Sequence, residues 1–428
     1  DRVPNPHMFE TGYEYQNIWT EPIDIKHGML RIRNEYFFRD LSNYRLEWAL
    51  LCNGIIVRTG QVEQIDCAPQ ATTDVMLPIG SCEGEGEFLL NVDYKLKEAE
   101  PLISAGQTIA YQQFTVKAGA LAQEEATGKL PSLKVKNNKH DSLLIVSNNA
   151  VNIQFDKRTG YMVAYTVDGQ RFMAEGGTLR PNFWRARTDN ELGAQFQKDN
   201  KVWKNPTLTM TTFQVEKVKK PQPCVEVTAV DDMPDVKAKL TLTYSIHGDG
   251  SVKVMEQMQT DKETKQPWMP RFGMVMQLPY DMDCSAYYGR GPVENYPDRK
   301  LSQRIGIYNL TADEQFYPYI RPQETGLKTD VRWWYQMTAA GKGMRIEADE
   351  PFSVSALHYA IEDLDEPNGQ KSQRHSPQVP MSKYTNLCID GAHAGVGGVN
   401  SWSTWGLALP PYRVPYQDRT FTFSIRRR

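Results

Sequence analysis

The chain is dominated by short segments in which apolar and polar residues alternate, and turn-forming residues end each segment. A period of two puts successive side chains on opposite faces of a β-strand. From about Met29, six or seven such segments occur in roughly 95 residues, and the turn-forming runs Asn53-Gly54 and Gly84-Glu85-Gly86 separate some of them. This spacing predicts an immunoglobulin-like β-sandwich over residues 26–120.

Alternation resumes at about Asp141 and continues to the end of the chain, for example in VKAKLTLTYSIHGDGSVKVMEQMQT and RTFTFSIRRR. At most two short helices are expected, in AYTVDGQRFMAEGG and QFQKDNKVWKN. No strand–helix–strand alternation occurs, which excludes a (β/α)8 barrel and a Rossmann fold. We therefore predict an all-β protein with one large double-sheet sandwich over residues 141–428.

Two segments lack this periodicity. Residues 1–25 are rich in Pro and aromatic residues, and we predict an extended lead-in from an upstream element. The chain opens with DRVPNP rather than Met, which indicates a piece of a larger protein. Residues 121–140 lie in a polar run rich in Ala, Gly and Lys, which predicts an interdomain linker.

Charge and composition argue against several classes of protein. The 428 residues include 49 basic and 52 acidic side chains, a net charge of −3, which favours neither nucleic acid nor an anionic membrane as a partner. No apolar run approaches the ~20 residues that span a bilayer. The six cysteines form no CxxC pair, the seven histidines are dispersed, and no G-x-S-x-G motif occurs. Because the cysteines and histidines are not clustered, we expect no metal site.

Four dense segments combine aromatic, charged and Gly or Pro residues and are candidates for chemistry: 182–191, 288–299, 321–334 and 390–402. In the second, Glu294 and Asp298 could be paired carboxylates for acid–base catalysis. The alternative is that Arg290 and Arg299 hold them in structural ion pairs.

The segment DGAHAGVGGVNSW contains four glycines, which predict a flexible, tightly turning loop that ends on Trp402. Its glycine spacing is no dinucleotide fingerprint, because no strand-then-helix context surrounds it. A Trp on such a loop can stack on the apolar face of a pyranose. The alternative is that Trp402 closes the end of the sandwich.

These segments resemble the C-terminal half of the large bacterial β-galactosidases of glycoside hydrolase family 2. The run EYFFRDLSNYRLEWALLCNG resembles their fourth-domain sandwich, and DRVPNP resembles the segment that leaves the catalytic barrel. Four runs resemble hallmarks of the fifth domain, the small chain: NFWRARTDNELG, GRGPVENYPDRK, YIRPQETGLKTDVRWW and DGAHAGVGGVNSW. Arg187 departs from the family, which more often has Pro at this position.

The resemblance implies a galactose-mutarotase-like supersandwich for residues 141–428 and a parent enzyme that hydrolyses terminal β-D-galactosides with retention. It puts both catalytic glutamates in an upstream (β/α)8 barrel, so we expect no catalytic residue in this chain. It implies that Trp402 contacts the substrate, with Asn400 and Ser401 as neighbours, and we add His393 to these candidates. We expect no cofactor on this chain, and any divalent or monovalent cations would belong to the barrel.

The sequence thus predicts the C-terminal accessory part of a β-galactosidase, inactive alone. Its expected partners are the catalytic barrel of the same polypeptide and a galactoside, in a parent that forms a homo-oligomer. One alternative is an autonomous carbohydrate-binding module. Another is an independent aldose epimerase or lyase, with His393 and Glu294 or Glu324 as acid and base. Periplasmic and cytoplasmic bacterial parents both fit the sequence.

Overall fold

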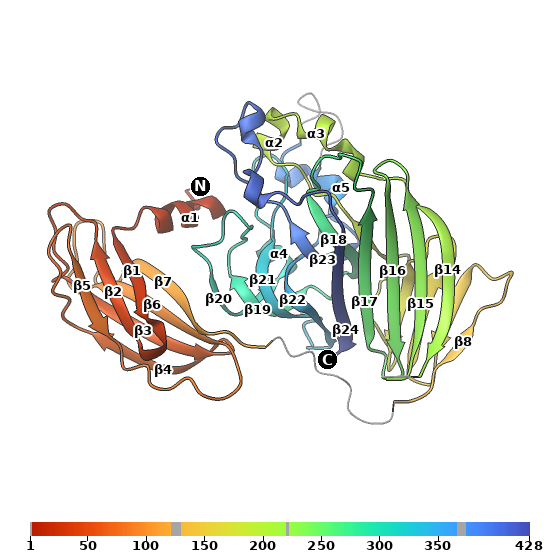
Figure 1. The fold of residues 1–428 in the computed structure, drawn as a ribbon, viewed down its shortest axis with the longest axis horizontal. Coiled ribbons are helices and arrows are strands. Elements are labelled where there is room, and N and C mark those ends of the chain that lie inside the picture. Colours follow the sequence, from red (N-terminus) through yellow and green to blue (C-terminus); the bar gives the residue numbers. More distant parts are fainter. Residues whose placement is uncertain (1, 121–129, 220–221, 366–373) are drawn as a thin grey trace. The chain divides into compact units, whose positions relative to one another are not determined.

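The computed structural model describes residues 2–120, 130–219, 222–365 and 374–428, and most of its regular structure is β-strand (Figure 1). The all-β class predicted from the alternation is therefore confirmed. The chain divides into two compact units. The first comprises Asp1–Ala122 and Leu301–Ile307, and the second comprises Gln123–Lys300 and Tyr308–Arg428.

The first unit consists of two antiparallel sheets, with strand orders β1-β2-β5 and β4-β3-β6-β7. Its side chains alternate along β3, so that Tyr44, Leu46, Trp48 and Leu50 are buried in the core between the sheets. The elements are α1 (Pro6–Glu14), β1 (Ile18–Asp24), η1 (Ile25–His27), β2 (Met29–Asn34), β3 (Tyr44–Cys52), β4 (Ile55–Val62), β5 (Thr72–Met76), β6 (Phe88–Leu96) and β7 (Thr108–Lys117).

Residues 1–25 are not the extended lead-in that we expected, since they contain α1 and β1. Pro6 stands in the first turn of α1, where its fixed φ favours helix initiation. The helix buries only Pro6 and Tyr13, so it has no apolar stripe that the sequence could reveal. β1 pairs with β2 from Ile18 to Asp24 and so forms part of the sandwich.

The second unit contains the remaining strands and short helices. They are β8 (Lys134–Lys136), β9 (Leu143–Ser147), β10 (Val151–Asp156), β11 (Met162–Val167), β12 (Gln170–Arg171), β13 (Leu179–Asn182), α2 (Asp189–Gly193), α3 (Phe196–Asp199), η2 (Lys201–Trp203), β14 (Thr209–Val218), β15 (Cys224–Met233), β16 (Ala238–His247), β17 (Val252–Thr260), β18 (Arg271–Pro279), β19 (Cys284–Gly291), β20 (Arg304–Thr311, which begins in the first unit), α4 (Ala312–Gln315), β21 (Lys328–Met337), β22 (Gly343–Leu357), α5 (Ile361–Leu364), η4 (Ser376–Gln378), β23 (Tyr384–His393), η5 (Thr404–Gly406), η6 (Pro410–Tyr412) and β24 (Arg419–Arg427).

The second half of the predicted linker 121–140 contains a short strand. Residues 121–129 lie outside the described residues, but Lys134–Lys136 form strand β8, which pairs with β9. Two of the three β8 residues are lysines, and the strand is too short for its alternation to stand out in the sequence.

The long strand β22 belongs to two branches of the large sheet. Its first half, Met344–Ala348, pairs with β24, and that branch continues through β17, β16 and β15 to β14. Its second half, Ser353–Leu357, pairs with β23, and that branch continues through β18 to β13. Of the four residues between the two halves, Asp349–Pro351 are exposed and Phe352 is buried. The sheet therefore forks within one strand, and a single hydrophobic core is built from strands of both branches.

All six cysteines are free thiols, so each unit is stabilised by burial and strand pairing without disulfides. The longest described helix has nine residues, and no described helix has the length and apolarity that a membrane crossing requires.

Candidate functional site

The glycine-rich segment that follows β23 is held at its start by a fully buried arginine. We call residues 394–406 the Trp402 loop. The guanidinium of Arg185 donates hydrogen bonds to the carbonyl oxygens of Ala394, at 2.8 Å, and Gly395, at 2.7 Å. Glu191 in turn holds Arg185 through an ion pair of 2.5 Å, and both side chains are at most 1% exposed. A buried cation with three acceptors fixes the backbone where the loop leaves the sheet.

Helix α2 contacts the Trp402 loop at several points. The amide of Asn190 donates to the carbonyl oxygens of Val396, at 3.0 Å, and Gly406, at 2.6 Å, and so connects the two ends of the loop. At the end of the helix, a Cβ on Gly193 would lie 2.2 Å from the carbonyl oxygen of Ser401. Glycine is therefore needed there for the loop to approach the helix this closely.

A carboxylate holds the glycines in the middle of the loop. Asp298 accepts hydrogen bonds from the backbone N–H groups of Val396, at 3.0 Å, and Gly397, at 2.8 Å. Asp298 is thus part of the scaffold of the Trp402 loop, and the carboxylate is occupied by backbone donors rather than facing another acid.

The tip of the loop is a small hydrogen-bonded turn that leaves two tryptophans in solvent. The side-chain oxygen of Asn400 accepts from the backbone N–H of Trp402, at 3.2 Å, and of Ser403, at 3.1 Å. The side chain of Ser403 then accepts from the N–H of Trp405. Trp402 is 79% exposed and Trp405 is 65% exposed. A large apolar side chain on a restrained, exposed turn is typical of a contact surface.

Of the four predicted binding residues, the structure brings together Asn400, Ser401 and Trp402 but buries His393. Its Nδ1 donates to the carbonyl of Ala394, at 2.8 Å, and its Nε2 lies 3.7 Å from Glu324. Burial lowers the pKa of His393 to about 4, although the Glu324 carboxylate acts to raise it. The ring is therefore neutral at pH 7. Among the described residues no hydrogen bond or ion pair joins His393 to Trp402.

Next to His393, burial and an ion pair with Arg271 have opposite effects on the pKa values of two buried carboxylates. Arg271 contacts Asp390 at 2.9 Å and Glu324 at 4.0 Å. Burial raises the pKa of Asp390 to about 7 even though Arg271 acts to lower it. Burial also acts on Glu324, but Arg271 and His393 outweigh it and hold the pKa of Glu324 below its usual range.

The proposed catalytic use of Glu294 is not supported by its surroundings. The carboxylate accepts from Arg299 at 2.5 Å, Tyr319 at 2.6 Å, Thr325 at 2.9 Å and the backbone of Gly326 at 2.7 Å. These four donors occupy both oxygens and leave the group no free lone pair directed at a substrate. The alternative prediction, a structural ion pair, is correct for Glu294, which pairs with Arg299. Arg290 pairs with Asp330 instead.

Arg187, which departs from the family pattern, forms a buried ion pair with Asp365, and the indole of Trp184 donates to the same carboxylate at 2.9 Å. The first dense segment of the sequence is thus structural, and it supplies Arg185, Asn190 and Glu191 to the support of the Trp402 loop. In the described ranges no group of three or more His, Cys, Asp or Glu side chains is placed to hold a metal ion.

Comparisons with known proteins give two family matches and several similar proteins. Residues 147–425 match the family described as β-galactosidase small chain, and residues 30–117 match the one described as β-galactosidase, domain 4. The β-galactosidase of Priestia megaterium is 31% identical over 99% of this chain and 39% of its own length. That of Halalkalibacterium halodurans is 29% identical over 100% of this chain and 41% of its own length. A galactose 1-epimerase from Lactobacillus acidophilus superposes with a TM-score of 0.37 and 12% identity over 69% of this chain and 99% of its own.

The fold and the family matches together define an all-β chain with two modules that match β-galactosidase families. The chain belongs to the β-galactosidase small chain family, with a β-galactosidase domain 4 before it. It spans about two fifths of the length of the curated relatives that it matches.

Proposed function

We propose that this chain is the C-terminal accessory part of a retaining β-galactosidase of glycoside hydrolase family 2. In this proposal a (β/α)8 barrel elsewhere in the same polypeptide supplies the catalytic glutamates. The chain contributes Trp402 to the galactoside-binding surface, with Asn400 and Ser401 beside it. The observation that carries the proposal is the exposure of Trp402 on a loop that Arg185, Asn190 and Asp298 restrain.

Restraint matters because a stacking platform gains affinity when it is already in place before the sugar arrives. The hydrogen bonds from Asn400 hold the turn, so little conformational entropy is lost when a ring packs against the indole. The carboxylates of Glu294, Asp298 and Glu324 have protein partners, which favours a scaffold role for this chain over an acid–base role. His393 is buried and belongs to this scaffold, so it is not one of the proposed substrate contacts.

The test uses the full-length parent enzyme. Trp402→Ala should lower kcat/KM for a chromogenic β-galactoside by an amount worth about 1–3 kcal/mol, because one stacking partner is lost. The matched control is Leu301→Ala, which also removes an exposed apolar side chain. Trp333 is unsuitable as a control because it lies within strand β21. Unchanged kinetics in Trp402→Ala would remove this residue from the site, and clear hydrolysis by the isolated chain would refute the accessory role.

A further inference from the structure

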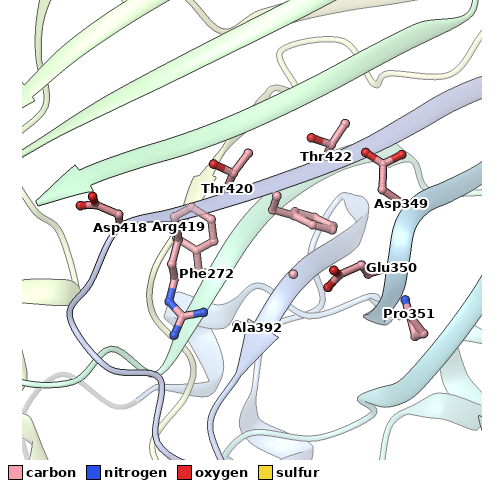
Figure 2. Close-up of a pocket in the computed structure, with 11 residues that line it drawn as sticks. Phe272, Asp349, Glu350, Pro351, Ala392, Asp418, Arg419, Thr420 and Thr422 are labelled. Atoms are coloured by element: carbon pink, nitrogen blue, oxygen red, sulfur yellow. The ribbon is translucent and has the colours of Figure 1, made fainter.

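A cavity of about 430 Å³ lies where β22 changes partners (Figure 2). β24 pairs with β22 only from Phe423 onward, and β23 pairs with β22 only up to Asp390. The residues beyond those points, Arg419–Thr422 on β24 and Gly391 and Ala392 on β23, line the cavity together with Asp349–Pro351. The fork of the sheet therefore opens two strand edges toward one space, whose volume is in the range of small-molecule sites, ~300–1,000 Å³.

Arg419 faces inward at this fork without a partner for its Nε atom. On β24 it shares a face with the buried Phe421 and Phe423, and its cross-strand neighbour is the fully buried Met258. The Nε atom is inaccessible to solvent and has no hydrogen-bond acceptor among the described residues. Burial lowers the pKa of this guanidinium. A cation in such a place costs stability unless something accepts its hydrogen bonds.

Acceptors from β22 lie on the other side of the cavity. Figure 2 shows Glu350 and Arg419 on opposite sides, carried by β22 and β24. Glu350 is exposed, and Asp349, also on β22, pairs with Lys253 at 3.7 Å. Asp418 is in the lining beside Arg419, where it accepts hydrogen bonds from Thr260. With three carboxylates and one guanidinium, the cavity repels a strongly anionic ligand. It offers the Glu350 carboxylate as an acceptor opposite the Arg419 donor, which suits a neutral molecule with several hydroxyl groups.

Apolar surface completes the lining. Phe272 and Phe421 contribute rings, and a Cβ on Gly391 would lie 2.5 Å from the ring of Phe421. Gly391 is the extra residue of a β-bulge opposite β18, because Phe272 pairs with Ala392 while Gly273 pairs with Asp390. A bulge at this point turns the strand edge, and the two rings beneath it stay buried, Phe272 at 1% and Phe421 at 7% exposed.

We propose that this cavity binds a neutral sugar unit, with Arg419 donating to hydroxyl oxygens and Glu350 accepting from hydroxyl groups. This site is separate from Trp402 and does not depend on the function proposed for that residue.

The experiment titrates the whole chain with D-galactose and, separately, D-glucose, followed by ligand-observed NMR. We expect saturable binding of at least one of these sugars with a dissociation constant of about 1 mM. Arg419→Met and Glu350→Gln should each weaken it by about tenfold, the cost of losing a charged hydrogen-bond partner. Arg171→Met and Glu263→Gln are the matched exposed controls and should leave it unchanged.

Two further arms make the outcome decisive. Trp402→Ala should retain the binding; if it abolishes binding while Arg419→Met does not, the cavity proposal is overturned and the Trp402 surface is the sugar site. D-galacturonate should bind more weakly than D-galactose, and tighter binding of the acid would overturn the assignment to a neutral ligand.

A purely structural role for Arg419 makes a different prediction. The methionine variant should unfold at the same or a higher temperature, because a half-buried cation with an unpaired Nε is removed, whereas a structural arginine would lower the unfolding temperature. Glu350→Gln, at an exposed position, tests binding without any risk to folding. Absence of binding to the unmodified chain up to about 50 mM of both sugars would also overturn the proposal.

Discussion

Asp298 lies so close to Gly395 that a Cβ atom on this glycine would come within 2.2 Å of the carboxylate. The same carboxylate holds the next two residues through their backbone N–H groups. The contact explains why a glycine stands here although its φ is not in the left-handed region. Close approach of a charged side chain to the backbone leaves no space for a methyl group.

Gly395→Ala should therefore destabilise the chain by about 1–3 kcal/mol, the usual cost of forcing an extra carbon into a packed site. Gly397→Ala is the matched control, because its Cβ would lie 3.2 Å from the same carboxylate, and a small shift accommodates that distance. Urea unfolding of both variants measures the difference. Equal stability of the two variants would contradict the packing argument.

Glu191→Ala should destabilise the chain by about 3–5 kcal/mol, because it leaves the buried Arg185 without its ionic partner. Asp189→Ala, two residues earlier in α2, removes a carboxylate that is 55% exposed and should cost less than about 1 kcal/mol. Chemical denaturation compares the two. A small effect of Glu191→Ala would mean that water reaches Arg185 and that the Trp402 loop is held less firmly than its contacts indicate.

Glu256 is fully buried, both of its carboxylate oxygens lack a hydrogen-bond partner among the described residues, and burial raises its pKa well above the usual value. The folded state therefore keeps a proton that the unfolded chain releases above about pH 4.3. Since the folded state binds more protons, stability falls as the pH rises, by up to about 1.4 kcal/mol per unit.

Glu256→Met should accordingly stabilise the chain, more at pH 8 than at pH 5. Glu216→Gln, at an exposed position of β14, is the control. Unfolding free energies at the two pH values measure the effect. A destabilisation that is the same at both would indicate that Glu256 has a partner in solution.

His393 should give stability the opposite pH dependence to that of Glu256. Its pKa is lowered to about 4 in the folded state, so the unfolded chain binds the extra proton between about pH 6.5 and 4. Stability from this group is present above pH 6.5 and is lost as the pH falls, by about 3 kcal/mol in total. His393→Gln should remove that loss, and the exposed His140→Gln should not. Urea unfolding between pH 7 and 4 tests it, and parallel pH profiles for all three proteins would be inconsistent with a neutral, buried His393.

Much of the fold could be predicted because strand alternation is a local property. Apolar residues two apart, as in Tyr44, Leu46 and Trp48, mark a strand whatever it packs against. The turn at Asn53-Gly54 is similarly local, since both residues have positive φ, the conformation for which Asn and Gly are preferred. The exposed Trp402 could be selected from its glycine-rich context together with the family resemblance.

What the sequence alone determined about this protein is its all-β class and its family. The tertiary structure decided which charged residues form scaffold. Glu294 and Asp298 are four residues apart and resemble a catalytic pair, but their partners Tyr319 and Gly397 are distant in the sequence. The fork of β22 and the inward position of Arg419 likewise arise from pairing with β23 and β24, which no local pattern encodes. Strand formation depends on neighbouring residues, whereas the environment of a charge depends on segments that only folding brings together.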